Sequence, residues 1–562
     1  MKFIRYFFIV IASVIVLLIL ILLGGYLYLS KIETSVKDPI VSYSHFYDNE
    51  PVQKITDSVS KFHKGWIRTN PYGLYEMYVE GDAYERGTQI GKLTQPLINF
   101  QEDKLINKYN ELLDTRRCSP LAENLIKLIA NKVAPKINTE YKEELYGISQ
   151  VSLDTFCETN SNFSRFVAYQ TLHDLGHSFP NFVKLGCTSF SVKNKYTENG
   201  ALMVGRTFDF WLSDPLAEKK IVSFINPSTG YKFITLSWPM LIGIVSGMNE
   251  KGLTITINTA NSKIPREFGT PVAIVAREIL QYAQNIEEAV AIAAQKSIFI
   301  NESFMISSSQ DHKSVLIEKT SKKMAVYDNY NDLIIATNHF QGNKMKMDDL
   351  NKEYIQSSAS IYRQRRVEQV VKNIDTVMTP AKMVAVLRND KGLNNANIGL
   401  GNEMCINQLN THHSVVFLPD SLQMWVSSNP YQFGEYVCYD LKEIFAHASD
   451  SLSKLSPSTV ATVSKNIPAD PFVYSEAYCE YTYFLNTKKQ IQAQTLQTLD
   501  VKKFTHANSE FFETYELMGD FYLYKKDYKN ARMMFEKALK KEIPTRYNQN
   551  KILSKIAQCK ES

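Results

Sequence analysis

The longest apolar run of the chain extends from Tyr6 to Leu29, directly after Lys2 and Arg5. As a helix rising about 1.5 Å per residue it would be about 36 Å long, enough to cross a hydrocarbon core of about 30 Å. No clear small-residue cleavage site follows, so we expect an uncleaved transmembrane anchor at 1–30 in preference to an unusually long signal peptide. The basic residues before the run predict a cytoplasmic N-terminus and a single-pass topology, with the body on the periplasmic or extracellular side.

Four further regions follow from the polar and apolar pattern. A polar stretch with little periodicity predicts a stalk, and apolar residues at helical spacing, as in Leu105 to Leu113 and Leu121 to Ala130, predict a helical segment after it. A region of alternating strands and helices comes next. Beyond about Ala448 the composition changes and helical spacing returns. The predicted regions after the anchor are 31–71, 72–186, 187–447 and 448–562.

Short β-branched and aromatic runs predict strands throughout 187–447. One longer periodic stretch, Pro271 to Lys296, predicts a helix with Val275, Ile279 and Tyr282 on one side. Strands, then a helix, then strands predict an α+β layered domain. Besides the two strands discussed next, the predicted strands are Ile221–Ile225, Phe233–Leu236, Thr254–Asn258, Phe304–Ser307, Val315–Glu318, Met324–Tyr327, Leu333–Thr337, Ser414–Leu418 and Leu422–Ser427.

Cys187 begins the most informative pair of strands. Cys187 to Val192 and Ala201 to Phe210 have strand character, and the turn signal Asn199-Gly200 lies between them. A two-residue loop at that turn would leave Arg206 about six residues from the cysteine, or about 20 Å at about 3.3 Å per residue. A wider loop starting near Lys193 would bring Arg206 beside Cys187, and we predict this wider loop.

Composition and motifs narrow the chemistry. Lys plus Arg exceed Asp plus Glu by 63 − 58 = 5, a mild excess that gives no sign of a nucleic-acid partner. The chain has no G-x-S-x-G, H-E-x-x-H or phosphate-loop motif and no cysteine pairs at zinc spacing, so no metal or cofactor is predicted. His412 and His413 are neighbours on a predicted strand and face opposite sides, which favours a structural role. Seven cysteines leave one unpaired if disulfides form.

The C-terminal region contains a spacing typical of a tetratricopeptide repeat. A single unit of that kind cannot bury its own apolar face, so it either docks on the catalytic body or joins helices upstream, such as Ala477 to Thr487. An aromatic stripe at helical spacing is more often core than binding surface, although a protein partner would also fit. The matching positions are Tyr515, Met518, Gly519, Tyr522, Ala531, Phe535, Ala538 and Pro544.

A lone cysteine is more often a small core residue than a nucleophile, and the surrounding motifs change that balance. Their order and spacing from Gly81 to Pro430 resemble the N-terminal-nucleophile hydrolases of the penicillin acyltransferase and choloylglycine hydrolase group. The stretch from Gly81 to Gly91 is similar to one that precedes the nucleophile in the acyltransferase branch. The other matching segments are Gly186-Cys187-Thr188, Gly205-Arg206-Thr207-Phe208-Asp209, Gly247-Met248-Asn249-Glu250-Lys251-Gly252-Leu253 and Thr337-Asn338-His339-Phe340.

This resemblance implies a four-layer αββα sandwich and self-cleavage at the Gly186–Cys187 bond. The freed α-amino group of Cys187 would then act as the base for its own thiol, because reference pKa values are about 7.7–8.0 for such an amine and about 8.5 for a thiol. Region 72–186 would become a separate chain. Arg206 would favour the thiolate, and Asp209 would hold the new ammonium group.

Three more side chains have roles implied by the resemblance. Asn338 and Asn258 would donate to the oxyanion of the acyl intermediate, although Asn258 lies one position off the spacing of the bile-salt branch. Arg363 matches a second arginine of the family, with Arg365 and Arg366 close by. The ordinary alternatives are turn or strand-end caps for the asparagines and a solvated helix face for the arginine.

The expected function is a self-processing hydrolase that cleaves a linear amide of a small N-acylated molecule. An acyltransferase of the same fold that uses coenzyme A thioesters is one alternative, although that donor is a cytosolic metabolite. An inactive scaffold, held at the membrane by its N-terminal helix and binding a partner through the C-terminal repeat, is another.

Overall fold

A computed structural model of the chain describes residues 24, 36–41, 50–113, 120–151, 161–178, 184–211, 218–260, 267–447 and 465–559. Of the predicted anchor at 1–30, only Gly24 is among them, so the anchor lies outside the described residues and stays a prediction. None of the helices in the described ranges has both the length and the apolar character that crossing a bilayer requires.

The larger of two main sheets has eleven strands and is antiparallel except where β4 runs parallel to β9. β4 comes before Cys187 in the chain and β9 comes after it, so this pairing joins the two sides of the predicted cleavage site. In sheet order the strands are β1 (Gln53–Lys54), β2 (Val59–Phe62), β3 (Gly65–Thr69), β4 (Tyr75–Gly81), β9 (Ile221–Pro227), β10 (Phe233–Ser237), β11 (Ser246–Asn249), β12 (Leu253–Thr259), β13 (Glu302–Ser308), β14 (Lys313–Lys319) and β15 (Met324–Tyr327).

The second sheet has six antiparallel strands and contains the strand that starts beside Cys187. Its order is β16 (Leu333–Ala336), β6 (Thr188–Asn194), β7 (Gly200–Phe208), β17 (His413–Leu418), β18 (Gln423–Ser427) and β19 (Tyr436–Asp440). β5 (Lys184–Leu185) and β8 (Phe210–Trp211) form a short additional antiparallel pair. In the chain, β5 comes shortly before β6 and β8 shortly after β7.

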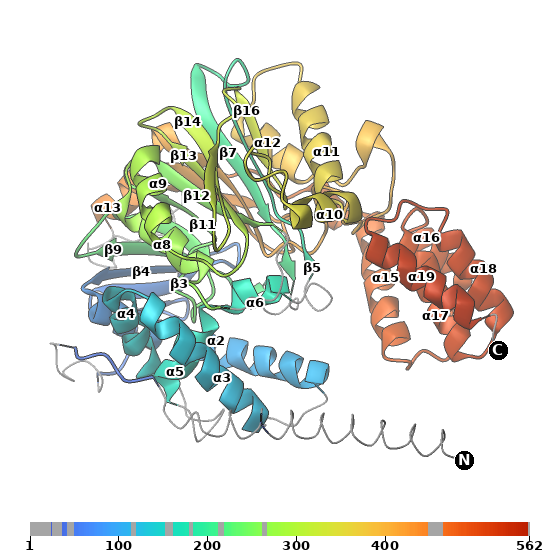
Figure 1. Cartoon of the computed structure of the whole chain (residues 1–562), viewed down its shortest axis with the longest axis horizontal. Coiled ribbons are helices and arrows are strands. Elements are labelled where there is room, and N and C mark those ends of the chain that lie inside the picture. The colour runs from blue at the N-terminus through green and yellow to red at the C-terminus, as the bar shows by residue number, and fades with distance from the viewer. Residues whose placement is uncertain are drawn as a thin grey trace, which may run out of the picture.

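The two sheets pack face to face, and helices cover their outer faces (Figure 1). β9 shows why the sequence folds this way, because Val222 and Phe224 belong to the core between the sheets whereas Ile221 and Ile225 belong to the core beneath the helices. A strand that is buried on both faces needs apolar residues at successive positions. The α+β class expected from the sequence is confirmed, and the layers run helices, sheet, sheet, helices.

Different helices form the two outer layers. The helices α2–α5, α8 and α9 pack on the eleven-stranded sheet, and α11 and α12 pack on the six-stranded sheet. In chain order the helices are α2 (Ala83–Leu113), α3 (Pro120–Val133), α4 (Thr139–Ser149), α5 (Asn162–Tyr169), α6 (Leu172–Ser178), α8 (Val272–Tyr282), α9 (Ile286–Gln295), α10 (Asp349–Ser357), α11 (Ser360–Lys372), α12 (Pro380–Leu387), α13 (Leu441–His447), α15 (Glu476–Gln492), α16 (Val501–Ala507), α17 (Phe512–Tyr524), α18 (Tyr528–Ala538) and α19 (Arg546–Gln558).

The β6–β7 loop has the width that the position of Arg206 required. Residues 195–199 connect the two strands, and Ser189 pairs with Arg206 across them. The Asn199-Gly200 signal is real, since φ is 55° and 71° at these residues, but it forms only the end of the loop. A register shift between Val192 and Asn194 accommodates the extra residues. The predicted wider loop is confirmed.

Two expectations need correction. Part of the predicted stalk at 31–71 forms β1, β2 and β3, which extend the eleven-stranded sheet from its β4 side. β1 and β2 are short and partly exposed, whereas β3 is buried at four of its five positions, Arg68 among them, so none of the three shows a clear hydrophobic alternation. The single helix predicted over Pro271 to Lys296 is two helices, α8 and α9. The break falls where Asn285 caps α9 by accepting the N–H of Glu288.

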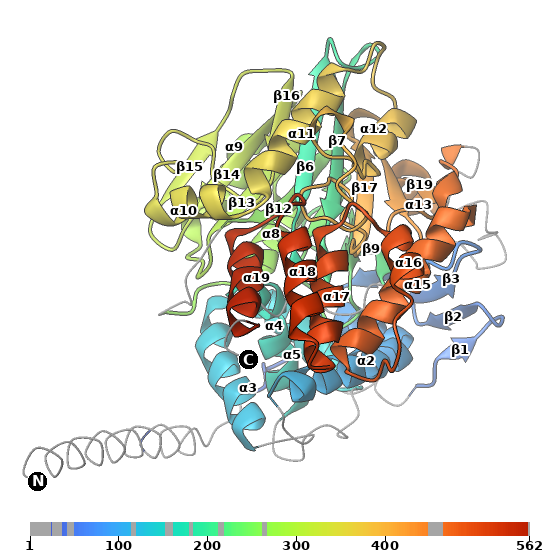
Figure 2. The same cartoon turned by 90° about the vertical axis from the view of Figure 1, so that its right-hand side faces the viewer.

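The C-terminal helices α15–α19 form a separate core that also contacts the body formed by the two sheets (Figure 2). Gly519 of α17 lies against the ring of Phe535 of α18, where an added Cβ would come within 2.3 Å of the ring. The aromatic stripe is therefore core, as expected. Leu409 and Phe433 of the body belong to the same cluster, so these helices both join one another and dock on the body. Their assignment as a tetratricopeptide repeat stays a prediction.

Candidate active site

Cys187 lies just before β6, with its Sγ atom 3.5 Å from Nη2 of Arg206 on β7. Both side chains are fully buried. The hairpin register accounts for this contact, because the pairing of Ser189 with Arg206 places the arginine two residues along from the cysteine on the neighbouring strand. Cys187 also belongs to the apolar cluster beneath the helices, together with Phe208 and Trp238.

Several acceptors fix the guanidinium of Arg206. Nη1 donates to the Val245 carbonyl and, over 2.5 Å, to Ser246 Oγ, while Nη2 also donates to the Ile257 carbonyl over 2.8 Å. The guanidinium carbon lies 4.5 Å from the centre of the Phe208 ring. With these contacts the cation is held in one orientation beside the thiol.

Burial and charge act in opposite directions on the Cys187 thiol. Burial raises its pKa, and the neighbouring Arg206 guanidinium lowers it by a smaller amount, so the net pKa lies above the ordinary value. The direction expected for Arg206 is therefore present, but desolvation outweighs it in the uncleaved chain. The thiol is neutral in this state.

The peptide unit before Cys187 is held at both its N–H and its carbonyl. The N–H of Gly186 donates to the backbone carbonyl of Asp209 over 3.1 Å. The Gly186 carbonyl accepts a hydrogen bond of 3.0 Å from Nε2 of Gln408. A Cβ at Gly186 would lie 2.3 Å from the same Nε2 atom, so only glycine permits this approach.

The carboxylate of Asp209 is buried and bonded to two hydroxyl groups. Thr411 Oγ1 donates to Oδ1 over 2.6 Å and Thr207 Oγ1 donates to Oδ2 over 3.2 Å. Burial raises the pKa of Asp209 to about 6, against the opposing effect of the Thr411 hydroxyl. Asp209 is therefore ionised at neutral pH.

Asn338 and Arg363 are brought together. Arg363 Nη2 donates to Asn338 Oδ1 over 2.6 Å, and Asn338 Nδ2 donates to the Thr259 carbonyl over 3.0 Å. Arg363 is buried rather than on a solvated face, whereas Arg365 is exposed and Arg366 binds other residues. The described hydrogen bonds to Asn338 include one from Arg363 and none from the other two arginines.

The structure places Asn258 between the two sheets. Its Oδ1 accepts from Ser189 Oγ over 2.9 Å, and its Nδ2 donates to the Ala336 carbonyl over 3.3 Å. Among the described hydrogen bonds of Asn258, none is made with Cys187. Because an amide nitrogen carries two hydrogens, one N–H remains beyond the bond to Ala336.

Sequence reasoning missed several residues that complete the site. Gln408 and Thr411 come from the irregular stretch before β17, where no motif marks them. His413 was interpreted as structural, and its Nε2 lies 2.8 Å from Ser246 Oγ, which in turn contacts Arg206. The one available signal was the density of polar residues from Asn402 to His413, which is unusual for a buried segment.

Glu302, at the start of β13, is a buried acid that no motif indicated. Burial raises its pKa to about 8, although Thr259 Oγ1 donates to its Oε2 over 2.8 Å and the N–H of Ser303 donates to its Oε1 over 3.0 Å. Its charge also acts on the titration of Cys187.

Within the described ranges, no group of three or more His, Cys, Asp and Glu side chains is arranged to hold a metal ion. The five described cysteines are free thiols, namely Cys187, Cys405, Cys438, Cys479 and Cys559. Cys118 and Cys157 lie outside the described residues.

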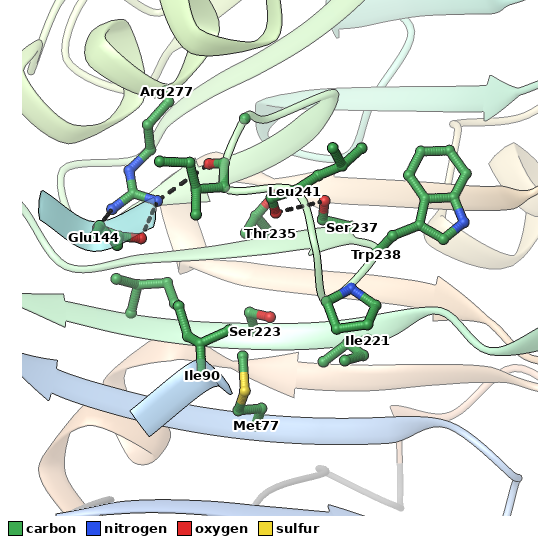
Figure 3. A pocket seen from close by; sticks show the side chains of 14 residues that line it. Met77, Ile90, Glu144, Ile221, Ser223, Thr235, Ser237, Trp238, Leu241 and Arg277 are labelled. Carbon is green, nitrogen blue, oxygen red and sulfur yellow. Dashed lines mark hydrogen bonds and ion pairs between the residues drawn. The ribbon is translucent and has the colours of Figure 1, made fainter. Parts of the chain in front are cut away.

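A pocket lies between the sheet and the helices that come before Cys187 (Figure 3). Figure 3 shows the ion pair of Glu144 and Arg277 at one end and Trp238 at the other. The ring of Trp238 lies 4.3 Å from that of His412, the neighbour of His413. Residues from both sides of the Gly186–Cys187 bond line this pocket.

Two curated relatives match part of the chain. A curated relative, protein dcd1B of Dictyostelium discoideum, is 27% identical over 269 residues, which are 43% of this chain and 49% of that protein. An uncharacterized protein of Archaeoglobus fulgidus is 24% identical over 254 residues, 42% of each chain. The chain thus spans about half the length of these relatives, or less.

Solved structures with some likeness include an acid amidase, a bile acid hydrolase and a penicillin acylase. An N-acylethanolamine-hydrolyzing acid amidase ortholog of Caenorhabditis elegans has 19% identity and a TM-score of 0.30, covering 42% of this chain and 93% of that one. The conjugated bile acid hydrolase of Clostridium perfringens has 15% identity and a TM-score of 0.32, covering 46% of this chain and 92% of that one. Penicillin V acylase of Agrobacterium tumefaciens has 17% identity and a TM-score of 0.32, covering 46% of this chain and 87% of that one. TM-scores of this size do not establish a shared fold.

The match to a family model bears most directly on the site. It begins after Cys187 and includes Arg206, Asp209, Asn258, Asn338 and Arg363. Residues 196–430 match the model of the acyl-coenzyme A:6-aminopenicillanic acid acyl-transferase family.

Proposed function

We infer that this protein is a self-processing cysteine amidohydrolase that cleaves a linear amide of a small N-acylated molecule. The observation that carries this proposal is the peptide unit Gly186–Cys187, whose thiol contacts Arg206 and whose carbonyl and N–H are both held by hydrogen bonds. A buried thiol between a cation and a fixed peptide bond is suited to attack on a neighbouring carbonyl carbon. The match over residues 196–430 supports acyl chemistry at the same site.

The mature enzyme begins at Cys187 and uses its α-amino group as the base. Sγ attacks the amide carbon of the substrate, the amine leaves with a proton, and the acyl group remains on the sulfur as a thioester. Water then releases the acid and restores the thiol. Asn338, oriented by Arg363, and Asn258 each retain an N–H for the oxyanion, and Asp209 holds the ammonium form of the α-amine.

The surroundings of Cys187 favour an apolar acyl group. The cysteine belongs to the same buried cluster as Phe208, Trp238, Met240 and Ile242. Such a cluster stabilises a hydrocarbon chain by removing it from water, at about 25 cal/mol per Å² of apolar surface. We therefore assign an N-acyl amide with an apolar acyl part as the substrate class.

Transfer of the acyl group to an amine is the second candidate, and the description of the matched family names such a reaction. Both reactions pass through the same thioester and differ in whether water or an amine accepts the acyl group. Incubation with a coumarin amide of a fatty acid, with and without an acyl coenzyme A and an amine acceptor, separates the two. Coumarin release without any acceptor supports hydrolysis, whereas release that requires the amine, or acylation of the amine by the acyl coenzyme A, supports transfer.

We further propose that residues 1–30 anchor the catalytic body to the outer side of a membrane and that the C-terminal helices bind a protein partner. The apolar run from Tyr6 to Leu29 supports the anchor. The competing hypothesis is an inactive scaffold that is anchored by residues 1–30 and binds a partner through its C-terminal helices. This hypothesis predicts neither self-cleavage nor labelling by a thiol-directed acyl probe.

The decisive experiment compares the full chain with Cys187→Ala and Cys438→Ala. Cys438 is also a buried free thiol but lies on the outer face of the six-stranded sheet, so it is a matched control. Mass spectrometry of the purified proteins should show two fragments, the second starting at Cys187, in the wild type and in Cys438→Ala only. An intact wild-type chain would contradict the proposal.

A further inference from the structure

The carbonyl oxygen of Gly186 is the atom on which negative charge develops if the Gly186–Cys187 bond is cleaved by the Cys187 thiol. In the uncleaved chain, Nε2 of Gln408 donates to this oxygen over 3.0 Å. Gln408 is itself buried, and its amide lies so close that a Cβ at Gly186 would collide with it. A donor at this distance has the geometry of an oxyanion-hole group.

We propose that Gln408 is a catalytic residue of the self-cleavage step, in which its side-chain amide stabilises the oxyanion formed at Gly186. This inference rests on the self-processing part of the proposed function. It separates the donor used for maturation from the donors assigned to substrate turnover, Asn338 and Asn258. The amide nitrogens of those two residues bind the Thr259 and Ala336 carbonyls, not Gly186.

Self-cleavage has two stages, formation of a thioester and its hydrolysis. The bond between Cys187 Sγ and the Gly186 carbon forms, the bond from that carbon to the Cys187 nitrogen breaks, and the thiol proton ends on the departing nitrogen. Between these events the Gly186 oxygen carries a full negative charge, which the N–H of Gln408 stabilises. A water molecule then adds to the thioester carbon and gives the Gly186 carboxylate and the free thiol, so one water is consumed.

The loop around Gln408 is built to hold this position. The N–H of Leu409 donates to Asn407 Oδ1 over 3.1 Å, and the N–H of Asn407 donates to the Asn389 carbonyl over 2.9 Å. Leu409 adopts a φ of 51°, which directs its side chain into the core of the C-terminal helices while the Gln408 amide reaches Gly186. Fixing the donor before the reaction reduces the reorganisation needed in the transition state.

The first test is Gln408→Met in the full chain, with Gln432→Met as the control. Gln432 is an equally buried glutamine whose amide nitrogen donates no hydrogen bond within the described residues. Removing one oxyanion donor typically slows a reaction on the order of 100- to 1,000-fold. Time courses of intact mass after rapid purification should show this slowing for Gln408→Met only. Equal cleavage rates in the two variants would overturn the proposal.

The second test distinguishes a donor from a packing role. In Gln408→Glu, a neutral carboxylic acid can donate to the oxyanion, whereas a carboxylate cannot and repels it. The cleavage rate of this variant relative to the wild type should rise as pH is lowered from about 8 to about 5, towards the ordinary Glu pKa of about 4.3. A ratio that stays constant with pH would overturn the donor role, even if Gln408→Met fails to fold.

The two proposals fail in different ways. If the wild-type chain remains intact, self-processing itself is wrong. If the wild type is cleaved and Cys187→Ala is not, but Gln408→Met is cleaved as fast as Gln432→Met, then only the role of Gln408 is wrong.

Discussion

Arg363 Nη2 donates a hydrogen bond of 2.6 Å to Oδ1 of Asn338, which leaves the amide nitrogen of Asn338 to donate. The arginine thereby fixes which end of the amide faces the Thr259 carbonyl and which N–H remains for a ligand. In the proposed reaction Arg363 is a positioning residue that acts through Asn338.

Replacing Arg363 with Met should lower kcat for amide hydrolysis on the order of 100-fold, because the Asn338 amide loses its fixed orientation. Self-cleavage should be retained, since Gly186 receives its hydrogen bond from Gln408. Fluorogenic amide turnover and intact mass, measured on the same sample, check both parts. Arg365→Met, on the exposed side of the same helix, is the control. Equal loss of cleavage and turnover would argue against the positioning role.

Asp209→Asn should shift the pH dependence of turnover. Asp209, with a pKa raised to about 6 by burial, is ionised above that pH and favours the ammonium form of the neighbouring α-amine. Loss of this charge lowers the pKa of the amine, so its neutral, basic form persists to lower pH. The acidic limb of the kcat/KM profile should therefore move down by about one pH unit or more. An unchanged limb would mean that Asp209 does not contact the amine.

The two chains produced by cleavage should remain associated. β4 pairs with β9, and the carboxylate of Glu144 binds Arg86 before the cleavage site over 2.7 Å and Arg277 after it over 3.1 Å. Native mass spectrometry of the cleaved protein should show one complex. Separate fragments under native conditions would contradict this prediction.

Glu144→Ala tests how much the ion pairs of Glu144 with Arg86 and Arg277 contribute to the free energy of unfolding. It leaves Arg86 and Arg277 as buried cations without this partner and should lower the free energy of unfolding by about 3–5 kcal/mol. Glu143→Ala, at the neighbouring and more exposed position, should change it by less than about 1 kcal/mol. Urea denaturation of the two variants measures the difference.

Glu302 should make stability fall as pH rises. Its folded pKa of about 8 lies above its ordinary value of 4.5, so between these pH values the folded state binds a proton that the unfolded state has lost. The free energy of unfolding therefore decreases across this window, by up to about 5 kcal/mol at about 1.4 kcal/mol per pKa unit. Glu302→Gln, which keeps the shape, should make this slope shallower in urea denaturation from pH 5 to pH 8, and the remaining slope comes from other buried acids such as Asp209. A slope equal to that of the wild type would exclude Glu302 as its source.

Much of the fold was predictable because its strands are short apolar runs bounded by polar turns. Val222 and Phe224 face one core and Ile221 and Ile225 the other, and this double burial makes the strand visible in the sequence. β1 and β2 escaped prediction because they are short, partly exposed strands at one edge of their sheet, and β3 escaped it because it is buried without an alternating pattern. The break between α8 and α9 escaped it because helical spacing continues on both sides of Asn285.

Some residues of the candidate site could be predicted from the sequence and others could not. Arg206 could be predicted to lie beside Cys187 because a hairpin relates them locally. Asn338 and Arg363 were named through the resemblance to a known pattern, and the structure places these two residues in contact with each other. Gln408 could not be predicted, because 222 positions separate it from Gly186 and no periodicity or motif connects residues across a fold. Its neighbour Leu409 likewise meets helices that lie beyond residue 475.

This last contact couples the position of Gln408 to the C-terminal helices. The loop from Gly399 to Thr411 is tied to the C-terminal helices by Leu409 and by hydrogen bonds between Leu400 and Asn508 of 3.0 and 2.9 Å. Gln408 lies within this loop, so losing the contacts with the C-terminal helices would loosen the hydrogen-bond donor beside Gly186. Self-cleavage that depends on this donor would then require the C-terminal helices to be docked on the body of the protein.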